Sequence, residues 1–498
     1  MRNDISATKV KDIFSEYLSK LNPTQLKTVE TIEGPVLVVA GPGTGKTQII
    51  ATRIAYILST NDAQAQPHNI LCLTYTDAGA IAMRKRLLQI IGTAAHRITI
   101  ETFHAFCNSV IQQNIESFGM RDLEPLSELE RFEILEEMIN ELEPTHLLKR
   151  LKGQIYFEAD RLQQLFNTMK QEDWSAEKIC HEADRYIADL PLRDDFIYKV
   201  KRGDKKKGDV KEDKVNAEIE KMEMLKAAAK LFPVYRNKMD KAGRYDYHDM
   251  ILWVIDAFTK NENLLRNYQE RFQYILVDEF QDTNGAQNEI INLLTNYWEA
   301  PNIFCVGDDD QGIYEFQGAR IKNIKDFTER YSNSLQTFVL KENYRSTQQI
   351  LDVAKKVIDN NQLRLSVQGT DLEKKLTAAL EERKKSEIEP VVHEYLNELH
   401  ETAGIAKQIL EWKKNGIRLS EIAILYHRHA HAAMLIDLFE KRSIPYQVNK
   451  SINILELLEV QQLLQVLFYI DCELRKPYKN DALLFEIMHF RFFKLSAS

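Results

Sequence analysis

The sequence predicts an α/β protein built on parallel sheets, with helical domains inserted between the strands. The first observation is a series of short runs rich in Val, Ile or Leu, each followed by a turn or a helical pattern. These runs begin near residues 36, 70, 97, 274, 302 and 337. Strands that alternate with helices favour a doubly wound parallel sheet, whose ligands bind beside the carboxyl ends of the strands.

The second observation is a change of character in residues 108–234, where charged helical patterns replace the strand signals. We interpret this interval as a helical domain inserted into a sheet domain that is made of residues 1–107 and 235–335. Residues 336–450, with a further strand expected at EIAILYHR, would form part of a second sheet domain. Residues 451–498 have the pattern of an amphipathic helix and would begin a second helical insertion.

The composition is that of a globular protein, with 44% hydrophobic and 28% charged residues in a chain of 498. No apolar run reaches the roughly 20 residues needed to cross a bilayer, and the polar amino terminus lacks the apolar region of a secretory signal. We therefore expect no membrane association and a cytoplasmic address. The five cysteines are scattered without a CxxC pair, which favours reduced thiols over a zinc site. A net charge of −8 disfavours a protein that coats nucleic acid by charge alone.

The run VLVVAGPGTGKT, residues 36–47, has the pattern of a buried strand that turns through glycines into a helix. Such a loop cradles phosphates with its backbone amides, which here belong to residues 41–46. We expect Lys46 to reach the β- and γ-phosphates of a nucleotide and the Thr47 hydroxyl to bind Mg²⁺. Ala40 stands where the first glycine of this pattern usually lies.

A metal-binding acid is expected at the end of a neighbouring strand, and YILVDEFQDTN supplies one. Asp278 follows an apolar run, so its carboxylate would emerge at the edge of the sheet and bind the same Mg²⁺ as Thr47. Glu279 is adjacent and could orient or deprotonate the attacking water. The alternative interpretation is a pair of solvated carboxylates at a strand end.

Three further segments carry groups suited to a nucleotide. Gln311 follows a strand and an acidic turn, where it could sense the γ-phosphate. Tyr344 offers an aromatic plane for a base, and Arg345 beside it offers a guanidinium for phosphate. Upstream of the loop, the side-chain amide of Gln25 could read the edge of an adenine.

Taken together, these segments resemble the motifs of the superfamily 1 DNA helicases of the UvrD/Rep/PcrA group. In chain order, LNPTQ is similar to the Q motif, AGPGTGKT to the Walker A loop, LTYTDAGAIAMRKRL to motif Ia and ETFHAFC to motif Ib. YDYHDMI resembles the segment that returns to the first motor lobe. ILVDEFQDTN is similar to motif II, VGDDDQGIYEFQGA to motif III, LKENYRS to motif IV and EIAILYHRHAH to a strand and turn of the second lobe.

The resemblance implies two RecA-like P-loop NTPase lobes with helical insertions, and ATP-driven movement along single-stranded DNA with 3′-to-5′ polarity. ATP and Mg²⁺ would be the cofactors. The chain would act as a monomer on single-stranded DNA and on junctions between single- and double-stranded DNA, with DNA-repair or replication proteins as partners. The expected catalytic residues are Lys46, Asp278, Glu279, Gln311 and Arg345. The expected nucleotide-binding residues are Gln25, Ala40, Gly41, Pro42, Gly43, Thr44, Gly45, Lys46, Thr47, Gln48, Tyr344 and Arg345.

Residues in turns that follow strands are expected to contact the DNA strand. The aromatic ones could stack on bases, at roughly 1–3 kcal/mol per base whatever the sequence, and the polar ones could contact phosphates. The competing interpretation places Phe103 in the core and makes His104 a structural histidine. The expected DNA-binding residues are Tyr75, Thr76, Thr102, Phe103, His104, Tyr314 and Phe316.

The sequence departs from the family pattern at several positions. Gln48 replaces an arginine that lies against the adenine, and Asp77 with Ala78 replaces an Asn-Lys pair on the DNA path. In motif III, Phe316 replaces a tryptophan and Gln317 an arginine. These changes bear on the coupling between ATP and DNA more than on the fold.

The family pattern continues through a second helical insertion to motifs V and VI, of which motif VI supplies an arginine to the γ-phosphate. The chain ends at HFRFFKLSAS, so we read it as the amino-terminal portion of a longer helicase or as a truncated product. We expect impaired turnover, since an arginine finger contributes about 10³–10⁵ in rate. The alternatives are a nucleotide-gated DNA- or partner-binding module without helicase activity, and the helicase part of a RecB/AddA-like helicase–nuclease.

Overall fold

The computed structural model describes most of the chain as two compact units, Met1–Pro390 and Val391–Ser498. The first unit contains a parallel sheet and helices inserted into it, and the described part of the second unit is helical. The described residues are 14–60, 64–118, 123–150, 153, 155–200, 206, 208–312, 321–360, 374–448, 455 and 457–490.

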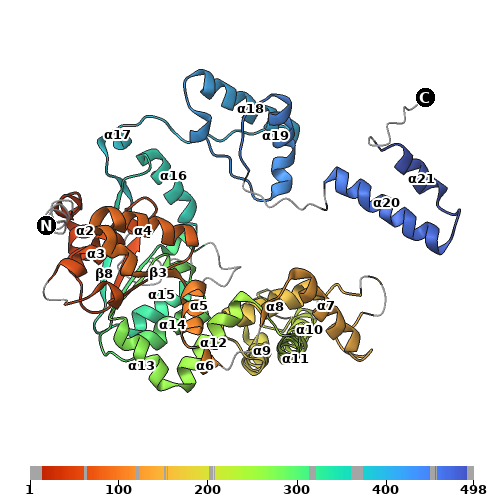
Figure 1. The fold of residues 1–498 in the computed structure, drawn as a ribbon, viewed down its shortest axis with the longest axis horizontal. Helices are drawn as coiled ribbons and strands as arrows, with labels where there is room; N and C mark the ends of the chain where they lie inside the picture. The colour runs from red at the N-terminus through yellow and green to blue at the C-terminus, as the bar shows by residue number, and fades with distance from the viewer. Residues whose placement is uncertain are drawn as a thin grey trace. The chain divides into compact units, whose positions relative to one another are not determined.

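A six-stranded sheet lies at the centre of the first unit (Figure 1). Its strands are β1 (Val36–Ala40), β2 (Ile70–Thr74), β3 (Thr99–Thr102), β6 (Tyr274–Val277), β7 (Asn302–Gly307) and β8 (Gln336–Leu340). Their order is β3-β2-β6-β7-β1-β8, and every neighbouring pair is parallel. β1, β2 and β6 are buried at every residue, as expected of a parallel sheet that is covered on both faces. The predicted α/β fold with a parallel sheet is confirmed.

Two layers of helices cover the sheet. They are α2 (Pro23–Glu30), α3 (Lys46–Ser59), α4 (Asp77–Ile91), α5 (Phe103–Gln113), α12 (Tyr247–Lys260), α13 (Glu262–Arg271), α14 (Gly285–Thr295) and α15 (Ile321–Arg330). Because successive side chains of a strand point to opposite faces, Val36 and Val38 pack with α2, α3 and α4. Leu37 and Val39 pack with the other five helices, and Figure 1 shows the two layers on either side of the sheet.

The helices between β3 and β6 include a group with its own core. They are α7 (Glu128–Glu141), α8 (Ala159–Gln171), α9 (Ala176–Asp189), α10 (Glu212–Ala229) and α11 (Phe232–Ala242), and the short helix α6 (Ile115–Phe118) precedes them. Apolar residues of α7 to α11 pack together, and the ring centroid of Phe166 lies 5.5 Å from that of Phe232 and 4.9 Å from that of Tyr235. β4 (Glu124–Pro125) pairs with β5 (Arg244–Tyr245) where the chain enters and leaves this group.

A buried ion cluster joins α8 to α12. Lys170 Nζ lies 2.8 Å from Asp246 Oδ2 and 2.7 Å from Asp249 Oδ1. Lys170 is 1% exposed, and a buried ammonium is stable only when paired groups replace its lost hydration. Asp246 also caps α12, since its side chain accepts hydrogen bonds from the amides of His248 and Asp249. The cluster therefore fixes how the inserted helices meet the sheet domain.

The chain after β8 remains in the first unit for two further pairs of elements. They are β9 (Glu342–Asn343), α16 (Gln348–Ile358), β10 (Thr377–Ala378) and α17 (Glu381–Lys384). We expected a domain boundary between residues 335 and 336. β8 lies beyond that boundary, but it pairs with β1 along its whole length and completes the first sheet. An apolar run indicates a strand but not the sheet that it joins.

The second unit contains α18 (Glu398–Lys414), α19 (His429–Lys441), α20 (Leu458–Arg475) and α21 (Asp481–Met488). Apolar residues of α18 and α19 pack together in a small core. The expected strand at EIAILYHR is wrong: no strand of the described chain hydrogen-bonds to this segment, and without a partner an extended run is not a strand. In the parts of the chain described above, no helix is both long and apolar enough to cross a membrane.

Short 3₁₀ helices lie at several of the connections. They are η1 (Pro67–Asn69), η2 (Gly92–Arg97), η3 (Leu190–Leu192), η4 (Asp194–Phe196), η5 (Phe280–Asp282), η6 (Asp309–Gln311) and η9 (Leu419–Glu421). η5 follows β6 after two residues, and η6 follows β7 after one. Both of these turns therefore begin at the carboxyl edge of the sheet, where ligands of parallel sheets bind.

Replacing Lys170 by Met should destabilise the protein by about 3–5 kcal/mol, because two buried carboxylates would lose their cation. Urea denaturation followed by fluorescence would measure the change in unfolding free energy. Lys221→Met is a matched control, since the side chain of Lys221 is 68% exposed and its ion pair with Glu218 lies at the surface. A loss for Lys170→Met no larger than that of the control would contradict this account.

Candidate functional site

The loop between β1 and α3 has the backbone that phosphate binding requires. Gly43 and Gly45 have φ angles of +70° and +89°, in the left-handed region that favours glycine. Thr44 is buried, and its Oγ1 donates to the carbonyl of Gly41 at 2.8 Å, which closes the turn. No described side chain caps α3, so its first backbone amides and its dipole present a positive end to an anion at Lys46.

Lys46 is the first residue of α3, and it forms an ion pair with Glu279 after β6. Lys46 Nζ lies 2.7 Å from Glu279 Oε2. Gln281 Nε2 donates to the same oxygen at 2.8 Å. The φ angle of Glu279 is +50°, a conformation that costs about 1–3 kcal/mol for a residue other than glycine and often occurs at functional sites. The fold therefore brings the expected phosphate-binding lysine and the expected base into contact.

Two carboxyls beside this pair have raised pKa values. Burial, followed by the charge of Glu279, raises the pKa of Asp278 to about 6, although Lys46 opposes the shift. The same two causes raise the pKa of Asp282 to about 6. Asp282 Oδ1 is buried and has no hydrogen-bond partner among the described residues. Carboxylates that are destabilised in this way gain from a nearby cation, so this edge of the sheet suits a divalent ion.

A cavity of about 420 Å³ lies at the carboxyl edge of the sheet. It is lined by residues from both expected sites. From the expected nucleotide site come Thr47, Asp278, Glu279 and Gln311, and from the expected DNA path come Tyr75 and Thr76. The other lining residues are Thr74, Gly79, Gln281 and Asp282. Segments that are far apart in the sequence therefore meet at one place.

Gln311 is the last residue of η6, on the acidic turn after β7. Its Nε2 donates to Asp308 Oδ2. The backbone amide of Asp308 in turn donates to Gln281 Oε1 at 2.9 Å. Since Gln281 also donates to Glu279, a continuous chain of hydrogen bonds connects Gln311 to the expected base. Gln311 is thereby held beside the cavity.

The segment that follows β8 packs directly on the phosphate loop. Asn343 Nδ2 donates to the carbonyl of Pro42, and the amide of Tyr344 donates to the carbonyl of Gly43 at 2.8 Å. A methyl group added at Gly43 would lie only 2.6 Å from Cβ of Arg345. Tyr344 and Arg345 therefore lie beside the loop although nearly 300 residues of sequence separate them from it.

Gln25 supports the loop through both ends of its side-chain amide. Its Nε2 donates to the carbonyl of Thr44 at 2.9 Å, and its Oε1 accepts from the amide of Asn22 at 3.1 Å. An adenine contact would have to compete with these bonds. Gln48 Nε2 donates to Thr52 Oγ1 at 3.3 Å, one turn further along α3. Ala40, the last residue of β1, is fully buried and cannot face a ligand with its side chain.

Sequence reasoning missed Arg53, which anchors the Q-motif helix α2 to α3. Arg53 is 1% exposed, donates to the carbonyl of Thr28 at 2.8 Å and lies 4.2 Å from the ring centroid of Phe304. The available signal was an arginine surrounded by apolar residues in IIATRIAYI. Four further residues of the site were not expected individually, although they lie within motifs II, III and IV: Gln281, Asp282, Asp308 and Asn343.

The threonines of the expected DNA path are helix caps. Thr76 Oγ1 accepts from the amide of Gly79 at 3.0 Å, and Thr102 Oγ1 accepts from the amide of Ala105 at 3.3 Å. Phe103 is 2% exposed and packs in the core between the sheet and α12. The expectation that Phe103 stacks on a base is therefore wrong, because its ring presents no free face. The interpretation of Phe103 as a core residue holds instead.

His104 lies next to a second histidine. Its ring centroid is 5.7 Å from that of His248 and 6.5 Å from that of Tyr247. Burial, and then the charge of His248, lower the pKa of His104 to about 4, so its imidazole is neutral near pH 7. A phosphate contact at His104 would therefore lack a full positive charge. Tyr314 and Phe316 lie outside the described residues.

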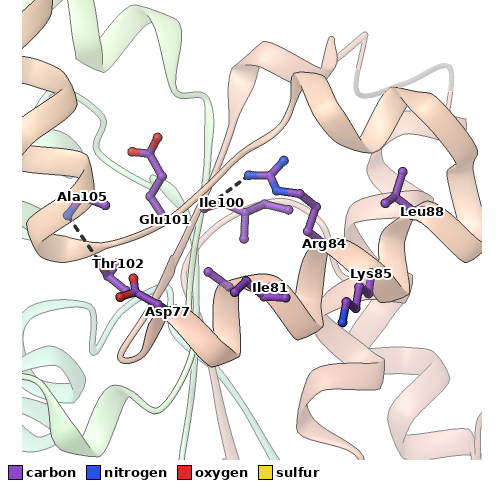
Figure 2. Close-up of a pocket in the computed structure, with 10 residues that line it drawn as sticks. Asp77, Ile81, Arg84, Lys85, Leu88, Ile100, Glu101, Thr102 and Ala105 are labelled. Carbon is purple, nitrogen blue, oxygen red and sulfur yellow. Dashed lines mark hydrogen bonds between the residues drawn. The ribbon is translucent and has the colours of Figure 1, made fainter.

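A second pocket, of about 370 Å³, lies beside α4, β3 and α5, and Figure 2 shows residues that line it. Thr102 lines it together with two carboxyls, Asp77 and Glu101. The guanidinium of Arg84 also lies here, but it donates to backbone carbonyls, including that of Ile100 at 3.1 Å (dashed in Figure 2). Burial raises the pKa of Glu101. Lys85 also lines the pocket, so its ammonium offsets part of the negative charge that Asp77 and Glu101 would bring to a phosphate contact at Thr102.

Gly43→Ala should weaken nucleotide binding at least about tenfold, because the new methyl would push Asn343 and Arg345 away from the loop. Gly34→Ala is the matched control: its φ is +78°, but nothing lies within 4 Å of an added Cβ. Both variants carry about 1–2 kcal/mol of backbone strain, and only the first adds a clash. Titration with a fluorescent ATP analogue would compare them, and equal affinities would contradict the packing described here.

Comparisons with known proteins agree with this geometry. The model of the UvrD/REP helicase N-terminal domain matches residues 21–332, and that of the UvrD-like helicase C-terminal domain matches residues 338–480. The ATP-dependent DNA helicase PcrA of Staphylococcus epidermidis is 29% identical over 450 residues, which cover 90% of this chain and 54% of that protein.

PcrA of Staphylococcus aureus is 29% identical over 456 residues, which cover 90% of this chain and 53% of that protein. The chain thus spans about half the length of the curated relatives that it matches. The first family model alone covers more than half of the chain, and it includes the loop, the acidic strand end and the turn of Gln311. The chain belongs to the UvrD/REP helicase family.

Proposed function

We propose that this chain acts as the ATP-binding motor of a DNA helicase that couples ATP hydrolysis to 3′-to-5′ movement along single-stranded DNA. The observation that carries the proposal is the cavity of about 420 Å³, since residues suited to a triphosphate and residues suited to a DNA strand line it together. A change in the position of Glu279 or Gln311 would alter the surroundings of Tyr75, because all three residues line the same cavity. The family membership and the named activity of the PcrA relatives support the same assignment.

The donors at this edge of the sheet fit Mg²⁺ bound to ATP. The Thr47 hydroxyl and the Asp278 carboxylate would hold the ion, and the unpartnered oxygen of Asp282, which lines the same cavity, would be available as a further donor. When bound, Mg²⁺ neutralises negative charge on the β- and γ-phosphate oxygens. The amides at the start of α3 and the Lys46 ammonium would also bind phosphate oxygens.

The ion pair between Lys46 and Glu279 suggests how Glu279 becomes free to act as the base. A triphosphate carries more negative charge than one carboxylate, so it would draw the Lys46 ammonium away from Glu279. Glu279, still held by Gln281, would then take a proton from the water that attacks the γ-phosphorus while the bond to the ADP oxygen breaks. Arg345, beside the loop, would stabilise the charge that develops on the γ-phosphate.

We propose single-stranded DNA and its junctions with duplex DNA as the substrates, DNA-repair or replication proteins as partners, and the cytoplasm as the location. Because Phe103 is buried, base stacking would depend on Tyr75, Tyr314 and Phe316, and the neutral His104 would contact phosphate without a full positive charge. Thr76 would contact the DNA backbone from the rim of the cavity.

Steady-state ATP hydrolysis with and without single-stranded DNA tests the proposal. Strong stimulation by DNA is the expected result for a motor. Binding of ATP and DNA without turnover would instead support a nucleotide-gated binding module. Failure to bind ATP at all would reject both functions.

Glu279→Gln should lower ATP turnover by about 10²–10⁴ and leave ATP affinity unchanged or tighter, because the variant loses the base but also a charge that repels phosphate. Single-turnover hydrolysis and analogue titration would measure the two effects. Glu270→Gln, at an exposed position of α13, is the matched control. Undiminished turnover in Glu279→Gln would remove Glu279 as the base.

A further inference from the structure

Lys374 is a buried lysine just before β10, and its ammonium lies among three consecutive carboxylates. Its side chain is 4% exposed and forms an ion pair with Asp308. Lys374 Nζ also lies 3.0 Å from Asp310 Oδ2 and 3.4 Å from Asp309 Oδ1. Within the described residues, the carboxylates of Asp308, Asp309 and Asp310 lie close enough together to bind one cation. The ammonium of Lys374 lies where that cation would bind.

The carboxylate of Asp308 connects Lys374 to the nucleotide site. One oxygen of Asp308 accepts from Lys374, and the other accepts from Gln311 Nε2. The amide of Asp308 donates to Gln281 Oε1, and Gln281 donates to the oxygen of Glu279 that also pairs with Lys46. A single polar network therefore runs from Lys374 to the phosphate loop.

The backbone around Lys374 is itself fixed against that loop. The amide of Thr377 donates to the carbonyl of Lys341 at 2.8 Å, and β10 pairs with β9. Leu376 lies so close to Gly41 that an added methyl there would be 2.7 Å from its side chain. Lys374 thus reaches the acidic turn from a segment that already touches the phosphate loop.

Removing the ammonium would leave Asp308, which is fully buried, without its cation. Burial, and then repulsion by the charge of Lys46, lower the pKa of Lys374 to about 7. The ion pairs with Asp308, Asp309 and Asp310 favour the charged form of Lys374. A triphosphate at the loop would add further negative charge near both lysines and relieve their repulsion.

We propose that Lys374 is a positioning residue of the nucleotide site: it holds the turn of residues 308–311 so that Gln311 faces the cavity. It acts through Asp308 and does not itself touch the substrate. The effect of Lys374 on nucleotide binding rests on the proposed function, whereas its effect on the position of the turn does not. The segment after β8 would then support the site at two points, with Asn343 at the phosphate loop and Lys374 at the acidic turn.

Hydrogen–deuterium exchange of the protein without nucleotide tests the first effect. Lys374→Met should accelerate exchange of the amides in residues 307–312, and Lys374→Arg should restore most of the protection. Lys375→Met is the matched control, because Lys375 is the next residue and is exposed. Equal protection of this turn in Lys374→Met and Lys375→Met would overturn the proposal. If Lys374→Met does not fold, Asp310→Asn weakens the same cluster more mildly and should give the same local pattern.

A double-variant cycle tests the second effect. Lys374→Met and Gln311→Ala should each weaken binding of a Mg²⁺-bound, non-hydrolysable ATP analogue about tenfold, and the double variant should be little weaker than either. Additive losses would show that Lys374 does not act through Gln311 and would overturn the proposal. If the unmodified chain binds no analogue, the proposed function fails, and the exchange measurement still decides the role of Lys374 in the turn.

Discussion

Carboxylates that gather at one edge of a parallel sheet are the constraint on which the whole site depends. Asp278 and Glu279 follow β6, and Asp308 follows β7, so the topology itself places them side by side. Left alone, these charges would repel both one another and a triphosphate. Lys46 comes from the helix that follows β1, and Lys374 comes from the segment after β8. One lysine that precedes these carboxylates in the sequence and one that follows them therefore stabilise the cluster.

The part of this arrangement that could be predicted from the sequence is the part with local causes. A buried strand needs an apolar run, and a tight phosphate loop needs glycine at positive φ, so VLVVAGPGTGKT specified β1, the loop and the start of α3. An acid directly after an apolar strand must emerge at the edge of the sheet, which is where Asp278 lies. The rule for parallel sheets then predicted that these segments would meet.

The remainder depends on partners that local pattern does not contain. Nothing in ETFHAF distinguishes a ring that packs under α12 from one that faces a base, and Phe103 packs. A glutamine before a phosphate loop is suited to an adenine, but the Gln25 amide is engaged by Thr44 and Asn22. Lys374 lies in a charged stretch that reads as solvent-exposed, and only the fold brings it to Asp308. Burial and long-range pairing decided each of these cases.

The pairing of β4 with β5 has a consequence for how such a protein could change over time. Arg244 Nε and Nη1 bind Glu130 and Glu124 at 2.7 and 2.5 Å, so the two strands that lead into and out of the inserted helices are closed against each other. An insertion whose ends adjoin imposes no stretch on its host. Its length and surface could therefore diversify, and new protein contacts could arise there, while the chemistry at the distant strand ends stayed untouched.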